Sequence, residues 1–295
     1  MKTITFYSYK GGAGRSSTTL NTLPYLVDAM DASASSPIIV LDMDLDSAGM
    51  TYLLDLDVHF KDSYDVKSFL MGEENWSDAA VSDLNEHPFF QKLVPVGNQL
   101  GVENGAVLFL GVDDRKPIDN NQMDGTKEGV FNKLNRFCRK NGIKAVVMDS
   151  SAGEQFSAVL ATRAANDIVC CMRPTMQFRI GTFNYLHRLS EKGQSSRVIL
   201  LPTVVPNLDK EIDGELQREK SIENIKKRAS DLKIEKICMK FVEPSCFGIN
   251  EVERFKWKEG VLYKIAQTDE LTPDEKEATK RYSKLASVLS GTLDD

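Results

Sequence analysis

The sequence predicts an α/β fold in which helices cover both faces of a mostly parallel, twisted sheet. Short apolar runs, several ending in an acid, alternate along the chain with longer segments of helical periodicity. The predicted strands are 2–8, 37–42, 143–149, 167–172, 197–201 and 236–242, and the predicted helices are 16–30, 126–141, 154–165, 178–192, 211–232 and 272–290. We expect a single domain over 1–295, with its ligand at the carboxyl ends of the strands.

The composition is that of an ordinary soluble globular protein. Hydrophobic residues make up 41% and charged residues 27%, and the formal net charge is -6. No apolar run approaches the roughly 18 residues needed to cross a bilayer, and the N-terminus is a strand rather than a signal peptide. The five cysteines lack C-x-x-C spacing, and three of them, Cys170, Cys171 and Cys238, fall in predicted strands. We therefore expect a cytoplasmic protein with buried, reduced thiols.

The first predicted strand leads into a glycine-rich loop, Lys10-Gly-Gly-Ala-Gly-Arg-Ser-Ser17, and then into the first predicted helix. A strand, a glycine loop and a helix in this order predict a phosphate-binding loop. Glycines allow successive backbone N–H groups to turn inward, and the helix N-terminus adds its positive dipole end. Ser16 falls where a hydroxyl reaches a magnesium ion on the phosphates.

Two positions depart from the common pattern G-x-x-x-x-G-K-[ST]. Tyr9 stands at the first glycine position, and Arg15 stands at the lysine position. Arginine is a planar, permanently charged fork that grips two phosphate oxygens but needs more room than lysine. We expect binding of a nucleoside triphosphate to be retained and hydrolysis to be weak. A protein that holds nucleotide without hydrolysing it stays open as an alternative.

Residues 10–17 resemble the deviant P-loop of the ParA/MinD family of ATPases, in a divergent branch with arginine at the usual lysine position. The resemblance implies a P-loop NTPase fold, ATP and Mg²⁺ as ligands, and ATP hydrolysis. It implies nucleotide contacts from Lys10, Gly11, Gly12, Ala13, Gly14, Arg15, Ser16 and Ser17. In that family the early lysine, Lys10 here, acts across a nucleotide-sandwich homodimer on the phosphates of the facing subunit.

The second strand ends in Asp42, which Asp44 and Asp46 follow at alternate positions. Carboxylates gathered after a buried strand are costly unless a cation or a water network is near. The pattern resembles the D-x-D switch I of the same family. That resemblance implies that Asp44 orients the attacking water and that Asp42 supports a metal site from the end of the strand, while Asp46 receives no role.

The third strand ends in Asp149-Ser-Ser-Ala-Gly153, which resembles a Walker B aspartate followed by switch II. The resemblance implies that Asp149 holds magnesium directly or through water, and that Gly153 allows the backbone to approach the γ-phosphate. Asn207, after the strand 197–201, is the best match to a residue that reads adenine in this family. An ordinary turn residue is an equally open interpretation of Asn207.

Two further segments carry predictions about surface and partners. Residues 113–124 are polar and predict a long exposed loop. The tail 282–295 places Tyr282, Leu285, Val288 and Leu289 on one helical face, but it ends in acids. We expect this face to dock onto the core of the protein rather than onto a membrane.

The resemblance implies an ATP-dependent dimerisation switch that engages a protein partner. A ParA-type DNA partition ATPase is an alternative that needs a basic surface. The best candidate segment, 209–240, holds nine Lys/Arg against eight Asp/Glu, and the net charge of -6 disfavours nonspecific DNA binding. A non-hydrolysing nucleotide-binding scaffold is the other alternative. Asp44 and Asp149 together favour the enzyme.

Overall fold

The computed structural model describes residues 1–72, 84–117, 128–173, 175–191, 196–205, 227, 248–256 and 260–292. Within these residues lies a seven-stranded sheet of order β3-β4-β2-β5-β1-β6-β7. Neighbouring strands run parallel except for β3 and β4 at one edge. The strands are β1 (Lys2–Ser8), β2 (Ile38–Met43), β3 (Val94–Pro95), β4 (Val107–Leu110), β5 (Ala145–Ala152), β6 (Asp167–Met172) and β7 (Arg197–Pro202). The predicted α/β fold with a mostly parallel sheet is confirmed.

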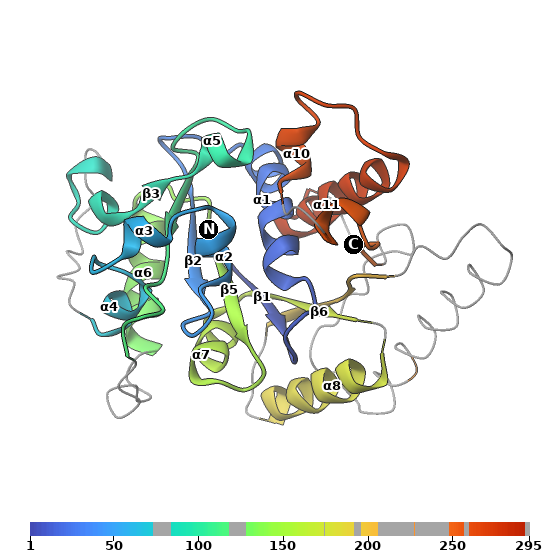
Figure 1. Ribbon diagram of the computed structural model, residues 1–295. Coiled ribbons are helices and arrows are strands. Elements are labelled where there is room, and N and C mark those ends of the chain that lie inside the picture. The colour runs from blue at the N-terminus through green and yellow to red at the C-terminus, as the bar shows by residue number, and fades with distance from the viewer. Residues whose placement is uncertain are drawn as a thin grey trace, which may run out of the picture.

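Helices cover both faces of this sheet, with α1 and α11 on one face and α6, α7 and α8 on the other (Figure 1). The helices of the described residues are α1 (Arg15–Met30), α2 (Gly49–Leu53), α3 (Asp57–Phe60), α4 (Val66–Leu70), α5 (Gly97–Leu100), α6 (Glu128–Lys140), α7 (Phe156–Ala164), α8 (Met176–Glu191), α10 (Leu262–Ile265) and α11 (Pro273–Ser290). Short 3-10 turns occupy Leu84–Glu86, Phe90–Lys92 and Glu253–Lys256. The predicted helix 211–232 and strand 236–242 lie outside the described residues.

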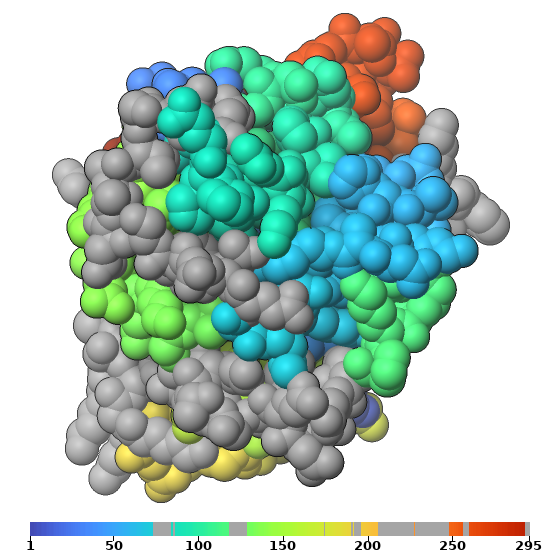
Figure 2. All heavy atoms as spheres, turned by 90° about the vertical axis from the view of Figure 1, so that its left-hand side faces the viewer, coloured from blue at the N-terminus to red at the C-terminus, as the bar shows by residue number. Residues whose placement is uncertain are grey.

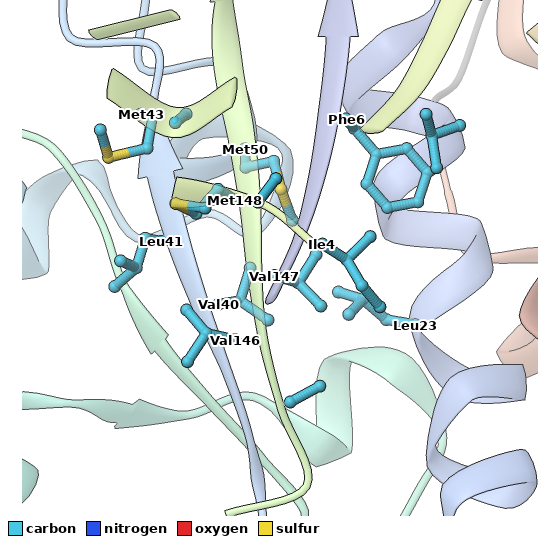
Figure 3. Close-up of a cluster of buried hydrophobic side chains, with 14 of the residues drawn as sticks. Ile4, Phe6, Leu23, Val40, Leu41, Met43, Met50, Val146, Val147 and Met148 are labelled. Carbon is cyan, nitrogen blue, oxygen red and sulfur yellow. The ribbon is translucent and has the colours of Figure 1, made fainter. Parts of the chain in front are cut away.

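The core is built around the central strands β1, β2 and β5. Every residue of β2 and β6 is buried, as expected for strands covered on both faces. Figure 3 shows part of this core, with labelled side chains from β1 (Ile4, Phe6), α1 (Leu23), β2 (Val40, Leu41, Met43), β5 (Val146, Val147, Met148) and α2 (Met50). Cys170 and Cys171 of β6 are buried free thiols, as predicted, and burial raises the pKa of both. Cys238 lies outside the described residues.

The C-terminal helix α11 packs along α1 and closes one face of the sheet. Tyr282, Leu285 and Leu289 are buried, and Val288 packs against the core from a partly buried position. The prediction that this face docks onto the protein itself is confirmed. Across the part of the chain that is described, no helix combines the length and the apolar character that crossing a membrane requires.

Hydrogen bonds fix the first residues of the predicted exposed loop 113–124 to the protein. Asp113 is buried, and its backbone N–H donates to Asp65 Oδ2 at 3.1 Å. The buried Lys67 ammonium donates to the carbonyl oxygens of Asp113 and Lys116 at 2.8 and 2.7 Å. In Figure 2 the blue atoms of the segment after β2 lie against the green atoms of residues 112–117. The prediction of an exposed loop is therefore wrong at Asp113 and holds at Arg115 and Pro117, which are exposed, while 118–124 lie outside the described part.

Candidate functional site

The glycine loop connects β1 to α1, as predicted from the sequence. Gly12 and Gly14 have φ of 75° and 69°, a left-handed conformation that glycine adopts without strain. Gly14 precedes α1, whose first turn contains no acidic residue. The positive end of the α1 dipole and its free N–H groups therefore face the loop. This local geometry suits an anion.

A cavity of about 540 Å³ opens beside the loop at the carboxyl ends of the central strands. Ser8 ends β1, Asp44 follows β2, and Ala152 ends β5, so three strands deliver residues to one place. The cavity is lined by Ser8, Gly11, Gly12, Ala13, Gly14, Arg15, Ser16, Ser17, Asp44, Ser47, Gly49, Tyr52, Leu53, Ala152 and Gln155. The predicted contact residues 11–17 thus share one cavity wall.

Arg15 lies at the centre of a buried charge cluster. Its Nη2 donates to Asp44 Oδ2 at 2.8 Å, and its Nε donates to Asp149 Oδ1 at 3.1 Å. Its Nη1 donates to Ser8 Oγ at 3.4 Å. Burial alone would lower the pKa of Arg15, but the two carboxylates outweigh it and raise that pKa. The guanidinium is therefore a fixed positive charge between two acids.

Asp149 is fully buried, and both of its carboxylate oxygens accept hydrogen bonds. Its Oδ2 accepts from Ser16 Oγ at 2.6 Å, and its Oδ1 accepts from Thr19 Oγ1 at 2.9 Å in addition to Arg15. Thr19 was not predicted as a site residue. Its position one helical turn after Arg15, on the face toward the sheet, is the signal that would have identified it.

Asp42 lies deeper, and the protein engages both of its oxygens. Oδ1 accepts from the backbone N–H of Asp44 at 3.2 Å, and Oδ2 accepts from the N–H and Oγ1 of Thr51 at 2.9 and 2.8 Å. Asp42 is paired in register with Asp149 on the adjacent strand. Burial, together with the nearby Asp149 carboxylate, raises the pKa of Asp42 to about 7. Asp42 thereby holds the turn that carries Asp44 and α2.

The Asp44 carboxylate is mostly buried at the cavity wall, where its side chain is 13% exposed. Burial raises the pKa of Asp44, and the ion pair with Arg15 opposes that shift. Asp44 thus lines the cavity. Its partner there is Arg15.

A divalent cation fits the pair formed by Ser16 and Asp149. Ser16 lines the cavity, and a hydroxyl and a carboxylate oxygen 2.6 Å apart are the hard oxygen donors that magnesium accepts. Among the described residues no group of three or more His, Cys, Asp or Glu forms a metal site by itself. The remaining oxygens around such a cation would have to come from phosphates and water.

Lys10 lies on the exposed outer side of the loop. Its Nζ donates to Gln177 Oε1 of α8 at 3.0 Å, and Lys10 is not part of the cavity wall. Arg173, which the sequence did not single out, donates from Nε to the Gly12 carbonyl at 2.7 Å. Gly153 has φ of 75° and donates to Ser8 O at 3.0 Å. Asn207 lies outside the described residues.

Of the comparisons with known proteins, the one with solved structures gives matches. No family model and no curated protein matches the chain. Among solved structures, the ATP complex of a McdA variant from Cyanothece is 14% identical, with 100% of this chain and 98% of that chain covered and a TM-score of 0.66. MinD in the MinC:MinD complex of Aquifex aeolicus is 16% identical (100% and 98% covered, TM-score 0.65).

MinD from Pyrococcus horikoshii in complex with Mg-ADP is 15% identical, with 97% of this chain and 94% of that chain covered and a TM-score of 0.57. At identities this low, the matches show that this chain and these structures share a fold. Since the matches span almost the whole chain, the protein shares the α/β fold of the McdA and MinD structures.

Proposed function

We propose that this chain, as one domain over 1–295, is a P-loop ATPase that binds ATP with Mg²⁺, hydrolyses it slowly, and dimerises on ATP to engage a protein partner. The observation that carries the proposal is the cavity at which the glycine loop, the N-terminus of α1 and the Asp44 carboxylate meet, with the Asp149 carboxylate buried behind Arg15 and Ser16. A cavity with this combination of groups suits a polyphosphate and its cation. The reducing cytoplasm is the expected compartment.

The phosphates are bound by the loop backbone and by Arg15. Gly11 to Ser17 present backbone N–H groups along the cavity wall, and the α1 dipole favours negative charge there. The guanidinium of Arg15 offers two parallel donors to phosphate oxygens. Lys10 adds a second positive charge from the outer side of the loop.

Ser16 and Asp149 would hold the magnesium ion, and Asp42 would support them from the adjacent strand. When bound, the ion supplies positive charge to the β- and γ-phosphates. Asp44 is placed to orient the attacking water, and it lines the same cavity. Hydrolysis is slow in this proposal because Arg15 pairs with Asp44 in the nucleotide-free site and must leave that carboxylate before Asp44 can orient water.

The solved structures support the ligands and the kind of partner. The McdA structure is an ATP complex, one MinD structure carries Mg-ADP, and another is bound to the protein MinC. We extend these properties to this chain: ATP and Mg²⁺ as ligands, a homodimer on ATP, and a separate protein as partner. Nonspecific DNA is a weaker candidate because the net charge is -6.

Calorimetric titration of the full chain with ATP, with and without Mg²⁺, tests the proposal. The wild type should bind ATP, and Ser16→Ala should lose the part of the affinity that depends on Mg²⁺. Ser283→Ala, on α11, serves as the matched control and should bind as the wild type does. Absence of heat from the wild type would refute nucleotide binding. Binding without phosphate release, even with the partner supplied, would favour the non-hydrolysing scaffold.

A further inference from the structure

The Arg15 side chain points inward, toward the ends of two strands. Its Nε and Nη2 diverge to Asp149 of β5 and Asp44 after β2, at 3.1 and 2.8 Å. The three side chains are 8%, 0% and 13% exposed, so water screens these ion pairs little. One guanidinium therefore bridges two carboxylates that a phosphate-bound cation and an attacking water would also need.

Arg15 and two hydroxyl groups occupy the Asp149 carboxylate oxygens that a metal ion would need. Asp149 Oδ1 already accepts from Arg15 and Thr19, and Oδ2 accepts from Ser16. A divalent cation that approached without phosphates would meet the full positive charge of Arg15 a few ångströms away. Like charges at such a distance repel strongly in a site of low dielectric.

We propose that Arg15 is the internal cation of the resting site and excludes a divalent cation until a polyphosphate arrives. The inference rests on the proposed nucleotide binding. Phosphate oxygens accept charge-assisted hydrogen bonds from the same Nε and Nη2 groups that now donate to the two carboxylates, so they compete for the guanidinium. Arg15 then turns from the carboxylates to the phosphates, which frees Asp149 and Ser16 for the cation and Asp44 for water. The site loads in a fixed order, with phosphate before or together with metal.

The shape of arginine is what allows the bridge. Nε and Nη2 lie on one rigid plane and reach two acceptors at once, whereas a lysine ammonium is a single point at the end of a flexible stem. Arg15→Lys keeps the charge but cannot span Asp44 and Asp149 in the same way. This variant should therefore relax the exclusion of metal without removing the positive charge from the loop.

Titration of the nucleotide-free full chain with Mn²⁺ alone, followed by the electron paramagnetic resonance signal of free Mn²⁺, tests the inference. Arg15→Ala should bind Mn²⁺ roughly 10- to 100-fold more tightly than the wild type, the size of effect that groups beside the metal ligands have on affinity. Arg15→Lys should show a smaller part of this gain, because its ammonium no longer bridges the two carboxylates but still repels the cation. Arg173→Ala is the matched control, because Arg173 also contacts the loop but through the Gly12 carbonyl and without a carboxylate. It should match the wild type.

Two further measurements test whether the gained Mn²⁺ binding occurs at Asp149. Adding Asp149→Asn to Arg15→Lys should abolish the gained Mn²⁺ binding. With a non-hydrolysable ATP analogue present in both samples, and after correction for the Mn²⁺ that the analogue binds in solution, the wild type and Arg15→Lys should bind Mn²⁺ alike. If the wild type alone binds Mn²⁺ as tightly as Arg15→Lys, the inference is overturned. If Arg15→Ala does not fold, Arg15→Lys decides. Because the Mn²⁺ titration uses no nucleotide, its failure is distinct from a failure of ATP binding in calorimetry.

Discussion

Arg15, Asp44 and Asp149 form a buried group of one cation and two anions contributed by α1, the turn after β2, and β5. In such a group each charge is tolerated because of the others. Removing one member of a buried ion pair leaves an uncompensated charge and typically costs about 3–5 kcal/mol. Substitutions here therefore change stability as well as chemistry, and each variant needs a melting curve beside its binding curve.

Asp44→Ala should leave ATP binding intact and abolish phosphate release. Arg15 keeps its pair with Asp149 in this variant, so the charge of the loop is preserved, but the carboxylate expected to orient water is gone. Calorimetry gives the binding and a coupled phosphate assay gives the turnover. Asp46→Ala, two residues later and exposed, is the matched control and should turn over as the wild type does. Unchanged turnover in Asp44→Ala would move the catalytic role to another residue.

At the scale of elements, the loop before α1 depends on glycine for its backbone shape. A Cβ at Gly14 would lie 3.1 Å from Val204 Cγ2, and the φ of 69° strains any residue with a side chain. Gly11 differs, because a Cβ there meets no atom within 4 Å. The same loop thus contains two positions whose backbone conformation requires glycine, Gly12 and Gly14, and one, Gly11, that does not.

Gly14→Ala should lower the melting temperature of the nucleotide-free protein and weaken ATP binding. The strain of a left-handed alanine costs about 1 kcal/mol or more, and the crowding against Val204 adds to it. Gly11→Ala is the matched control and should melt at the wild-type temperature, as followed by circular dichroism. Equal melting temperatures for the two variants would contradict the loop geometry described above.

The helix α11 begins with a capping box. Thr272 Oγ1 accepts from the Glu275 backbone N–H, and the Glu275 carboxylate accepts in return from the Thr272 N–H. Arg254 Nε also donates to the buried Glu275 carboxylate at 2.5 Å. Burial would raise the pKa of Glu275, but the hydrogen bonds from Arg254 and Thr272 outweigh it and lower that pKa.

Glu275→Gln should destabilise the protein at neutral pH by about 1 kcal/mol, because the ion pair with Arg254 is lost while the glutamine can still accept from the Thr272 N–H. Because the folded-state pKa lies below the ordinary value of 4.5, the carboxylate stabilises the fold above pH 4.5 and loses this effect as the pH falls further. The difference in free energy of unfolding between wild type and variant should therefore shrink below pH 4.5. Urea titrations at several pH values measure it, with the exposed Glu270→Gln as control.

At the scale of the whole molecule, the sheet order brings the glycine loop, Asp44 and Asp149 together at the carboxyl ends of the central strands. β5 lies between β1 and β2, so the ends of three strands from distant parts of the chain open into the same cavity. Lys10 lies outside that cavity, on the side of α8. A positive side chain at this position is available to phosphates presented by a facing subunit.

ATP, more than ADP, should drive dimerisation of the Asp44→Ala protein, and adding Lys10→Ala should leave it monomeric with ATP still bound. Two facing triphosphates repel, and opposing Lys10 side chains would offset that repulsion. Analytical ultracentrifugation measures the mass with each nucleotide. Lys280→Ala, an exposed lysine on α11, is the matched control and should still dimerise. A dimer that survives the loss of Lys10 would leave Lys10 acting within its own subunit.

The sequence by itself determined the elements whose signals are local. The glycine loop, the strands that carry Asp42 and Asp149, and the helix 272–290 were predictable, and the helix appears as Pro273–Ser290. The strand predicted to end at Asp149 continues to Ala152. These features depend on residues a few positions apart, through apolar periodicity and glycine at positive φ. The edge strands β3 and β4 were missed because they are short and lie in a segment without clear periodicity.

Only the tertiary structure decided what each charged side chain faces. Arg15 was expected to hold phosphate, and the fold pairs it with Asp44 and Asp149, which are distant in sequence and adjacent because β2 and β5 are neighbours. Thr51, which holds Asp42, could not be predicted as its partner for the same reason. Periodicity says which face of an element is buried, but the partner across that face depends on strand order and helix packing, which are properties of the whole chain.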